Sequence, residues 1–143
     1  MQKHTYIDLS TASSLLAKAS DDIDLVTKLL PDERQHDNCG YHLAQSVEKI
    51  LKFFCEVSVM SYAKDGKNGH SLKLLFKILM DAGEPKNIID FLDLSDLDVY
   101  DAGSRYDHVF PEDRLELKKY LGETRELFRD ALLKYQKIKK MQG

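Results

Sequence analysis

The sequence predicts an all-α protein, folded as an up-and-down four-helix bundle with one additional short helix. Apolar residues recur every three or four residues in four separate segments, which is the spacing of an amphipathic helix. No stretch alternates apolar and polar residues between turn residues, as a half-buried strand would. Pro31, Pro85 and Pro111 each fall where a predicted helix begins or ends. A chain of 143 residues suffices for one core, so residues 1–143 are predicted to form a single domain.

The first two predicted helices follow from their apolar stripes. The first stripe ends before Pro31, which cannot continue a helix. The second helix covers residues 40–55, and its stripe spans about 100° of the helix surface. The stripes consist of Leu16, Ala19, Ile23, Val26 and Leu30 in the first helix, and of Leu43, Val47, Ile50, Leu51 and Phe54 in the second.

A third helix is predicted over residues 71–81. Gly83 and Pro85 follow it, and both residue types are common after the end of a helix. Either His70 or Ser71 can cap its start, and a structural role of this kind is favoured for His70 over a catalytic one. The apolar positions of this helix are Leu72, Leu75, Phe76 and Leu79.

Two short apolar segments, residues 88–92 and 97–102, precede the last helix. In that helix, apolar positions step alternately by four and three residues, which is typical of packing at a shallow angle. An intermolecular coiled coil has the same spacing but is less favoured, because this helix has only about seven turns and the other stripes also need covering. The seam is Leu117, Leu121, Thr124, Phe128, Ala131, Tyr135 and Ile138, and the lysines that suit the end of the helix dipole are Lys134, Lys137, Lys139 and Lys140.

Composition and charge exclude several classes of function. The 21 basic and 24 acidic residues give a net charge of −3, which is untypical of a general nucleic-acid binder. No apolar run approaches the roughly 20 residues of a membrane span, and the N-terminal residues lack the apolar segment of a signal peptide, so a cytoplasmic protein is predicted. Cys39 and Cys55 are expected to be free thiols. No metal-ligand spacing is visible, and no cofactor is predicted.

One side of the second helix carries an unusual set of polar residues. His42, Gln45, Lys49 and Lys52 lie within about 80° of one another, and Phe53 is predicted to lie beside them rather than in the core. Such a set can bind a phosphate or nucleotide, with lysine as the charge, glutamine as the hydrogen-bonding group and phenylalanine as the stacking ring. The alternative, which is favoured when this helix is considered alone, is packing against another helix or a partner chain.

The segment DAGSRYDHVFPED, residues 101–113, is the second candidate site. Arg105, Tyr106 and His108 precede the final helix, and together they can grip a phosphate, stack on a base and transfer a proton. The N-terminus of the following helix adds backbone N–H groups that favour anions. Equally, Arg105 can pair with a neighbouring aspartate and Tyr106 can be a core residue.

Three stretches in this order resemble the HEPN domain family (higher eukaryotes and prokaryotes nucleotide-binding). They are YHLAQSVEKILKFF, GHSLKLLFKIL and SRYDHVF, and the resemblance extends from about Ser13 to Tyr135. The matching positions are His42, Gln45, Glu48, Lys49, Leu51 and Lys52 in the first stretch, Gly69, His70, Leu72 and Leu75 in the second, and Arg105 and Tyr106 in the third.

The resemblance implies a four-helix bundle with a short extra helix, often a homodimer. Family members commonly occur beside minimal nucleotidyltransferases, in toxin–antitoxin pairs, or in systems that handle nucleotides and RNA. Some are metal-independent ribonucleases, in which an arginine steadies the phosphate and a histidine four to six intervening residues later acts as acid or base. Here only two residues separate Arg105 from His108, and no other arginine has the required spacing, which argues against RNA cleavage.

A nucleotide- or phosphate-binding module, acting with a partner nucleotidyltransferase or in a toxin–antitoxin-type system, is therefore the favoured hypothesis, with no catalytic residue. A homodimer is expected, and RNA is a less favoured ligand. The alternatives are a metal-independent ribonuclease toxin that uses Arg105 and His108, or a non-catalytic dimerisation or adaptor bundle. The resemblance further implies that the polar side of the second helix lies near Arg105. The predicted ligand-binding residues are His42, Gln45, Lys49, His70, Arg105 and Tyr106.

Overall fold

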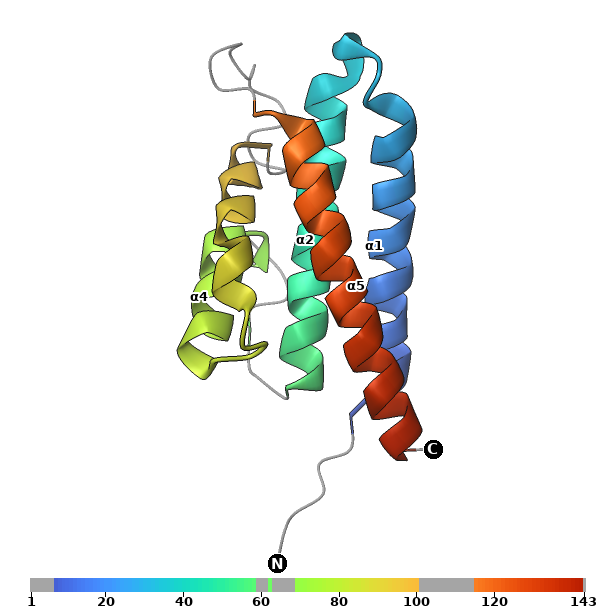
Figure 1. Cartoon of the computed structure of the whole chain (residues 1–143), viewed down its shortest axis with the longest axis vertical. Helices are drawn as coiled ribbons and strands as arrows, with labels where there is room; N and C mark the ends of the chain where they lie inside the picture. Colours follow the sequence, from blue (N-terminus) through green and yellow to red (C-terminus); the bar gives the residue numbers. More distant parts are fainter. Residues whose placement is uncertain (1–6, 59–61, 63–68, 101–114, 143) are drawn as a thin grey trace, which may run out of the picture.

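The structure, a computed structural model, is an all-α bundle, as predicted (Figure 1). It describes residues 7–58, 62, 69–100 and 115–142, and none of these forms a strand. α1 and α2 run in opposite directions, η2 returns in the direction of α1, and α5 runs alongside α2. The elements are α1 (Leu9–Leu29), η1 (Glu33–Gln35), α2 (His36–Val57), α4 (Leu72–Ala82), η2 (Ile88–Tyr100) and α5 (Leu117–Gln142).

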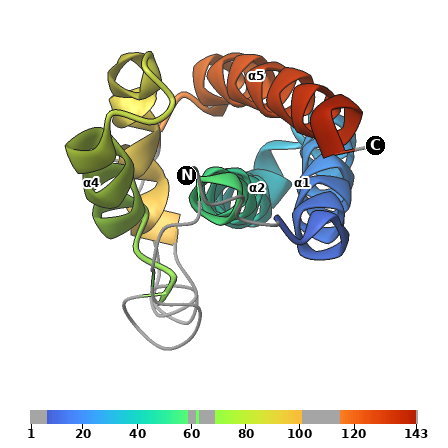
Figure 2. The ribbon, with the colours of Figure 1, turned by 90° about the horizontal axis from the view of Figure 1, so that it is seen from below.

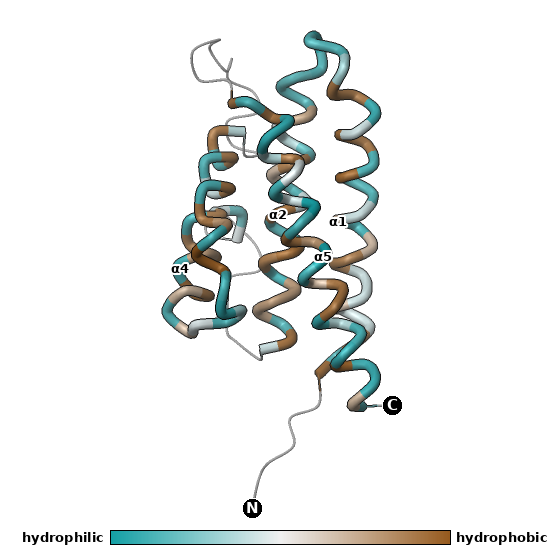
Figure 3. The backbone as a smooth tube through the Cα atoms, in the orientation of Figure 1, coloured by the Kyte–Doolittle hydropathy of each residue, from teal (hydrophilic) through white to brown (hydrophobic). Residues whose placement is uncertain are grey.

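The helix α2 lies at the centre of the bundle. Figure 2 shows α1, α5 and the α4–η2 pair arranged around it. Buried side chains therefore occur on nearly every side of α2, whereas the outer helices bury one stripe and expose the rest. Apolar and polar residues alternate along these outer helices in Figure 3. Burying a leucine-sized side chain contributes about 1.5–3 kcal/mol, so the α2 surface is the main source of stability. Fully buried core residues include Val26, Leu43, Ile50, Phe76, Leu94 and Leu127.

Both ends of α4 are fixed by specific hydrogen bonds. Ser71 is the N-cap, and its hydroxyl accepts from the backbone N–H of Leu74, so the cap is Ser71 and not His70. The carboxylate of Asp98 on η2 accepts from the backbone N–H groups of Leu72 and Lys73 at 2.8 and 3.1 Å. Because the first N–H groups of a helix have no partner inside it, Asp98 both caps α4 and attaches η2 to it.

The two short apolar segments predicted after α4 belong, as far as Tyr100, to one continuous 3₁₀ element, η2, and residues 101–102 of the second segment lie outside the described residues. Its apolar residues recur at intervals of three, and in a 3₁₀-helix residues three apart lie directly above one another. In an α-helix, which has about 3.6 residues per turn, residues spaced by three would not stay on one side of the helix. The spacing of three therefore explains both the length and the type of this element. The buried apolar residues are Ile88, Phe91, Leu94, Leu97 and Tyr100.

The seam of α5 packs inside the chain. Five of its seven positions are buried and the other two, Phe128 and Tyr135, are half-buried against the core. The helix contacts α1, α2 and η2, so neighbours in the same chain cover the four-three spacing, as a bundle requires.

Gly40 at the start of α2 allows the end of η2 to approach closely. A Cβ atom at this position would lie 2.5 Å from Cγ of the Tyr100 ring, whereas nothing lies within 4 Å of a Cβ at Gly122 on α5. We expect Gly40→Ala to destabilise the protein by about 1–3 kcal/mol through overpacking. Gly122→Ala is expected to stabilise it by about 0.5–1 kcal/mol through helix propensity. Urea unfolding measures the free energy of unfolding of both variants. Equal changes in the two variants would contradict the close contact between Gly40 and Tyr100.

Acidic residues of η2 and α5 meet at a second contact. Tyr120 donates a hydrogen bond to Asp96 at 3.0 Å, and Lys119 lies 3.6 Å from Asp93. Burial, followed by a hydrogen bond and charge repulsion from Asp93, raises the pKa of Glu123 to about 7. One oxygen of this carboxyl group is buried and has no hydrogen-bond partner among the described residues. The folded state therefore favours the protonated form of Glu123.

The raised pKa of Glu123 predicts a pH-dependent stability. Because the native state holds this proton more tightly than the unfolded state, the stabilising contribution is complete below pH 4.5 and is lost as the pH rises through about 7. Glu123→Gln mimics the protonated form, so we expect it to raise the thermal midpoint at pH 8 by roughly 1–3 °C and to add nothing at pH 4. Glu126→Gln, an exposed change one turn along α5, should have a smaller effect at pH 8. If the thermal midpoints of Glu123→Gln and the wild type differ by the same amount at pH 4 and pH 8, the raised pKa of Glu123 is refuted.

Candidate functional site

Two of the predicted site residues meet a carboxylate of α1. Asp22 lies 3.2 Å from Nδ1 of His42 through one oxygen and accepts a hydrogen bond from Nζ of Lys49 at 2.9 Å through the other. His42 and Lys49 are two turns apart on α2, so both can reach a single residue of the neighbouring helix. The Asp22 side chain is 16% exposed, which places this ion pair at the edge of the α1–α2 interface.

A second carboxylate, Glu48, organises the other flank of α2. Its two oxygens contact Nδ1 of His70 at 3.0 Å and Nζ of Lys52 at 3.1 Å. Glu48 is only 7% exposed, whereas His70 is 43% exposed. Since a buried charge is costly without a partner, His70 and Lys52 are needed to accommodate Glu48 in the bundle. This contact also attaches the turn before α4 to α2.

The predicted polar residues thus line one side of α2 but belong to two groups. We call His42, Gln45, Lys49 and Lys52 the α2 polar strip. His42 and Lys49 share Asp22, Gln45 is half-buried between the flanks, and Lys52 is buried against Glu48. The common partner of His42 and Lys49 agrees with the face that their spacing predicted, but Lys52 is buried rather than exposed to solvent. Much of the positive charge of the strip is neutralised within the protein.

The prediction for Phe53 was wrong. Its side chain is fully buried, and its ring lies 5.4 Å from that of Phe54 and 6.5 Å from that of Tyr135 on α5. The error arose because the helical wheel assumes one buried side, whereas neighbouring elements surround α2. Phe53 therefore belongs to the core and is not available to stack on a ligand.

The remaining predicted residues, Arg105, Tyr106 and His108, lie outside the residues that the structure describes. Their proximity to the α2 polar strip therefore stays a prediction.

The carboxylate contacts have a chemical consequence for both histidines. An ionised carboxylate can only accept hydrogen bonds, so Nδ1 of His42 and of His70 carries the proton in these contacts. In the neutral ring, Nε2 is then left as an acceptor, and protonation makes it a donor. Each partly exposed histidine is thus oriented to bind a hydrogen-bonding group or to exchange a proton. The two histidines rest on different carboxylates, Asp22 and Glu48.

Sequence reasoning missed Asp22 and assigned no role to Glu48. Asp22 stands beside Ile23 at the edge of the apolar stripe of α1, and an acidic residue in that position is a weak signal for an inter-helix ion pair. Its partner depends on how α1 is rotated against α2, which periodicity does not specify.

The described part of the chain offers neither a metal-binding cluster nor a membrane-spanning helix. No group of three or more histidine, cysteine, aspartate or glutamate side chains there could hold a metal ion. Within the same residues, no helix combines the length and apolar character needed to cross a membrane.

The fold and the α2 polar strip together define a helical bundle with a histidine- and lysine-bearing central helix. The family model for the HEPN domain matches residues 12–138, which is most of the chain. The protein therefore belongs to the HEPN domain family, whose members are helical modules related to nucleotides. No curated protein and no solved structure matches the chain.

The Asp22 contact gives a direct test of the polar strip. Asp22→Asn leaves Lys49 without its counter-charge and is expected to destabilise the protein by about 1–2 kcal/mol. Asp24→Asn removes the same charge from an exposed position on the same helix and should stay within about 0.5 kcal/mol of the wild type. Urea unfolding of the two variants compares them, and equal stabilities would argue against a stabilising role for Asp22.

Proposed function

We propose that this HEPN domain is a nucleotide- or phosphate-ligand-binding module. The observation that carries the proposal is the family match over residues 12–138, in a family related to nucleotides. The polar strip supports it, because His42 and Lys49 lie at a partly exposed edge of α2, where Lys49 has donors beyond its bond to Asp22 and protonation makes Nε2 of His42 a donor. The proposed ligand-binding residues are His42, Gln45, Lys49, His70, Arg105 and Tyr106.

Each of these residues has a proposed contact with the ligand that follows from its chemistry. Lys49 and Arg105 contact phosphate oxygens, with arginine able to make two parallel hydrogen bonds. Gln45 hydrogen-bonds the ligand through its amide, and Tyr106 stacks on a base. His42 and His70, each held through Nδ1, offer Nε2 to the ligand. Phe53 has no part in this proposal because it is buried.

The proposal extends to the protein's partners. A homodimeric cytoplasmic module of this kind would act with a minimal nucleotidyltransferase or in a toxin–antitoxin-type system. The homodimer and the partners rest on the family resemblance alone, and the cytoplasmic location rests on the apolar pattern of the sequence.

Calorimetric titration with nucleoside mono-, di- and triphosphates and with inorganic phosphate tests the binding function. We expect Arg105→Ala to weaken the binding of the preferred nucleotide by about tenfold or more, since a charge-assisted contact of about 1.5–3 kcal/mol is lost. Arg34→Ala is the matched control, because Arg34 is 88% exposed and pairs only locally with Asp32. The control should change the affinity less than about twofold.

Two outcomes would overturn the proposal. Either no nucleotide or phosphate binds the wild type, or Arg105→Ala binds as well as Arg34→Ala. Incubation of the same preparations with RNA in EDTA separates the binding module from a metal-independent ribonuclease. RNA cleavage that is lost in both Arg105→Ala and His108→Ala would assign the ribonuclease activity instead.

A further inference from the structure

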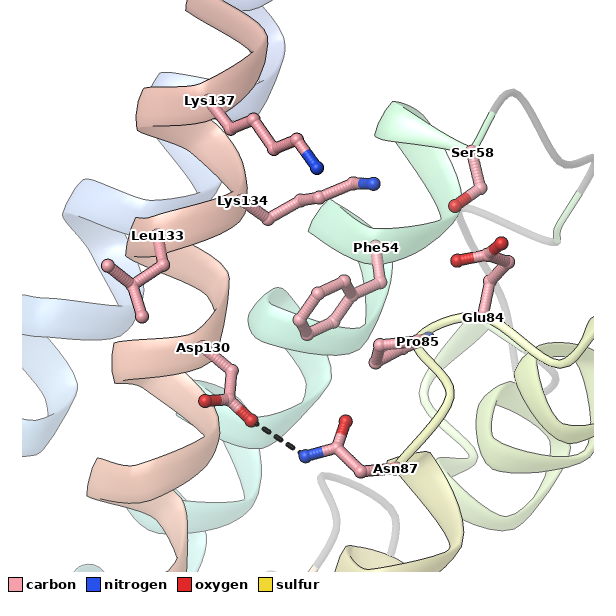
Figure 4. Close-up of a pocket in the computed structure, with 9 residues that line it drawn as sticks. All are labelled: Phe54, Ser58, Glu84, Pro85, Asn87, Asp130, Leu133, Lys134 and Lys137. Carbon is pink, nitrogen blue, oxygen red and sulfur yellow. Dashed lines mark hydrogen bonds between the residues drawn. The ribbon is translucent and has the colours of Figure 1, made fainter.

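A small pocket lies between the end of α2, the turn after α4 and the second half of α5. Its volume is about 350 Å³, within the range of small-molecule sites. Figure 4 shows Phe54 and Pro85 facing each other across the pocket, and Lys134 and Lys137 extending from α5 toward the end of α2. Phe54 lies on the side of α2 that faces α5, so the pocket shares no residue with the α2 polar strip.

Two lysines and two carboxylates, Lys134, Lys137, Glu84 and Asp130, line the pocket, but neither lysine forms an ion pair with a described residue. Among the described residues, no carboxylate lies within ion-pair distance of Lys134 or Lys137. Asp130 stands four residues before Lys134, a spacing that commonly gives an ion pair. Its carboxylate instead accepts a hydrogen bond from the Asn87 amide at 3.0 Å, and Lys134 points away from it across the pocket (Figure 4). Two like charges three residues apart repel each other unless an anion lies between them.

The walls of the pocket are held in place before any ligand arrives. Gly83 adopts a left-handed conformation with φ 67°, and the backbone N–H of Glu84 donates to the carbonyl of Leu79 at 3.1 Å, which fixes the turn that carries Pro85. The Asn87–Asp130 hydrogen bond then attaches this turn to α5. Preorganised walls reduce the entropy that binding must overcome.

We propose that this pocket binds a small phosphomonoester that carries a flat aromatic group. Each ammonium group has three donors, and two of them at one edge match the several acceptor oxygens and the double charge of a phosphate better than a single carboxylate. The aromatic group would cover Phe54 and Pro85, where it replaces water on apolar surface. Glu84 also lines the pocket and would repel the phosphate, so the phosphate lies at the lysine edge.

Phenyl phosphate is the probe, titrated by calorimetry against inorganic phosphate and phenol. The wild type should bind phenyl phosphate more tightly than either fragment, because only the whole molecule uses both parts of the pocket. The double variant Lys134→Gln/Lys137→Gln should bind it at least about tenfold more weakly. Glu84→Gln should bind it more tightly than the wild type, because a repulsive charge has been removed.

The matched control is Lys139→Gln/Lys140→Gln, which removes two charges from exposed positions on the same helix. It should change the affinity less than about twofold. If both double variants bind phenyl phosphate equally more weakly than the wild type, the lysines act only through general charge attraction, and the proposal is overturned. Absence of phenyl phosphate binding to the wild type, or affinity no better than that of inorganic phosphate, would do the same.

Lys49→Gln and Arg105→Ala distinguish this pocket from the proposed nucleotide site. Both variants should keep the affinity of the wild type for phenyl phosphate. Weaker binding of phenyl phosphate by either variant would show that the probe binds at the proposed nucleotide site, which would refute a separate pocket. Urea unfolding of Lys134→Gln/Lys137→Gln checks that the fold is kept. If the two lysines only stabilise the C-terminal end of α2 through its dipole, Lys134→Gln/Lys137→Gln would be less stable but would still bind phenyl phosphate as the wild type does. That result would also refute the proposal.

Discussion

The burial of α2 is the constraint on which the rest of the structure depends. Because other elements surround this helix, its charged residues have to find opposite charges inside the protein. An uncompensated buried charge costs several kcal/mol, so Glu48 needs Lys52 and His70, and Lys49 needs Asp22. These contacts connect α1 and the turn before α4 to the central helix. The residues that first suggest a binding site are therefore also part of what holds the bundle together.

Much of the fold was predictable because each long helix buries a stripe of its own. Helices were predicted correctly for α1, α4 and α5, because the spacing of apolar residues directly reflects which side of a helix is buried. The element η2 was not predicted as one unit, although Ile88, Phe91 and Leu94 carry its period of three. A 3₁₀-helix of this length is uncommon, so two short segments were the simpler interpretation.

The candidate site was only partly predictable. Spacing alone placed His42 and Lys49 on one face of α2, but their common partner lies on another helix, 20 residues or more away in the chain. Phe53 was misplaced for a related reason, because one helix considered alone does not reveal how many neighbours will cover it. Asp98 acts as a second cap of α4 from 26 residues away and carries no local signal at all. Contacts between elements depend on how helices are rotated against one another, and a period does not contain that information.

The lysines at the two proposed sites are in physically different surroundings. Lys49 and Lys52 lie against carboxylates at the interfaces of α2, where their charge is balanced and contributes mainly to stability. Lys134 and Lys137 lie on an outer helix and lack such partners among the described residues, so their field extends into the pocket beside them. A phosphate at α2 has to compete with Asp22 for Lys49, whereas at α5 it would meet two lysines that form no ion pair with a described residue. Sequence motifs therefore indicate the family through α2, while the lysines of α5 without an ion-pair partner among the described residues are the basis for proposing a second anion site.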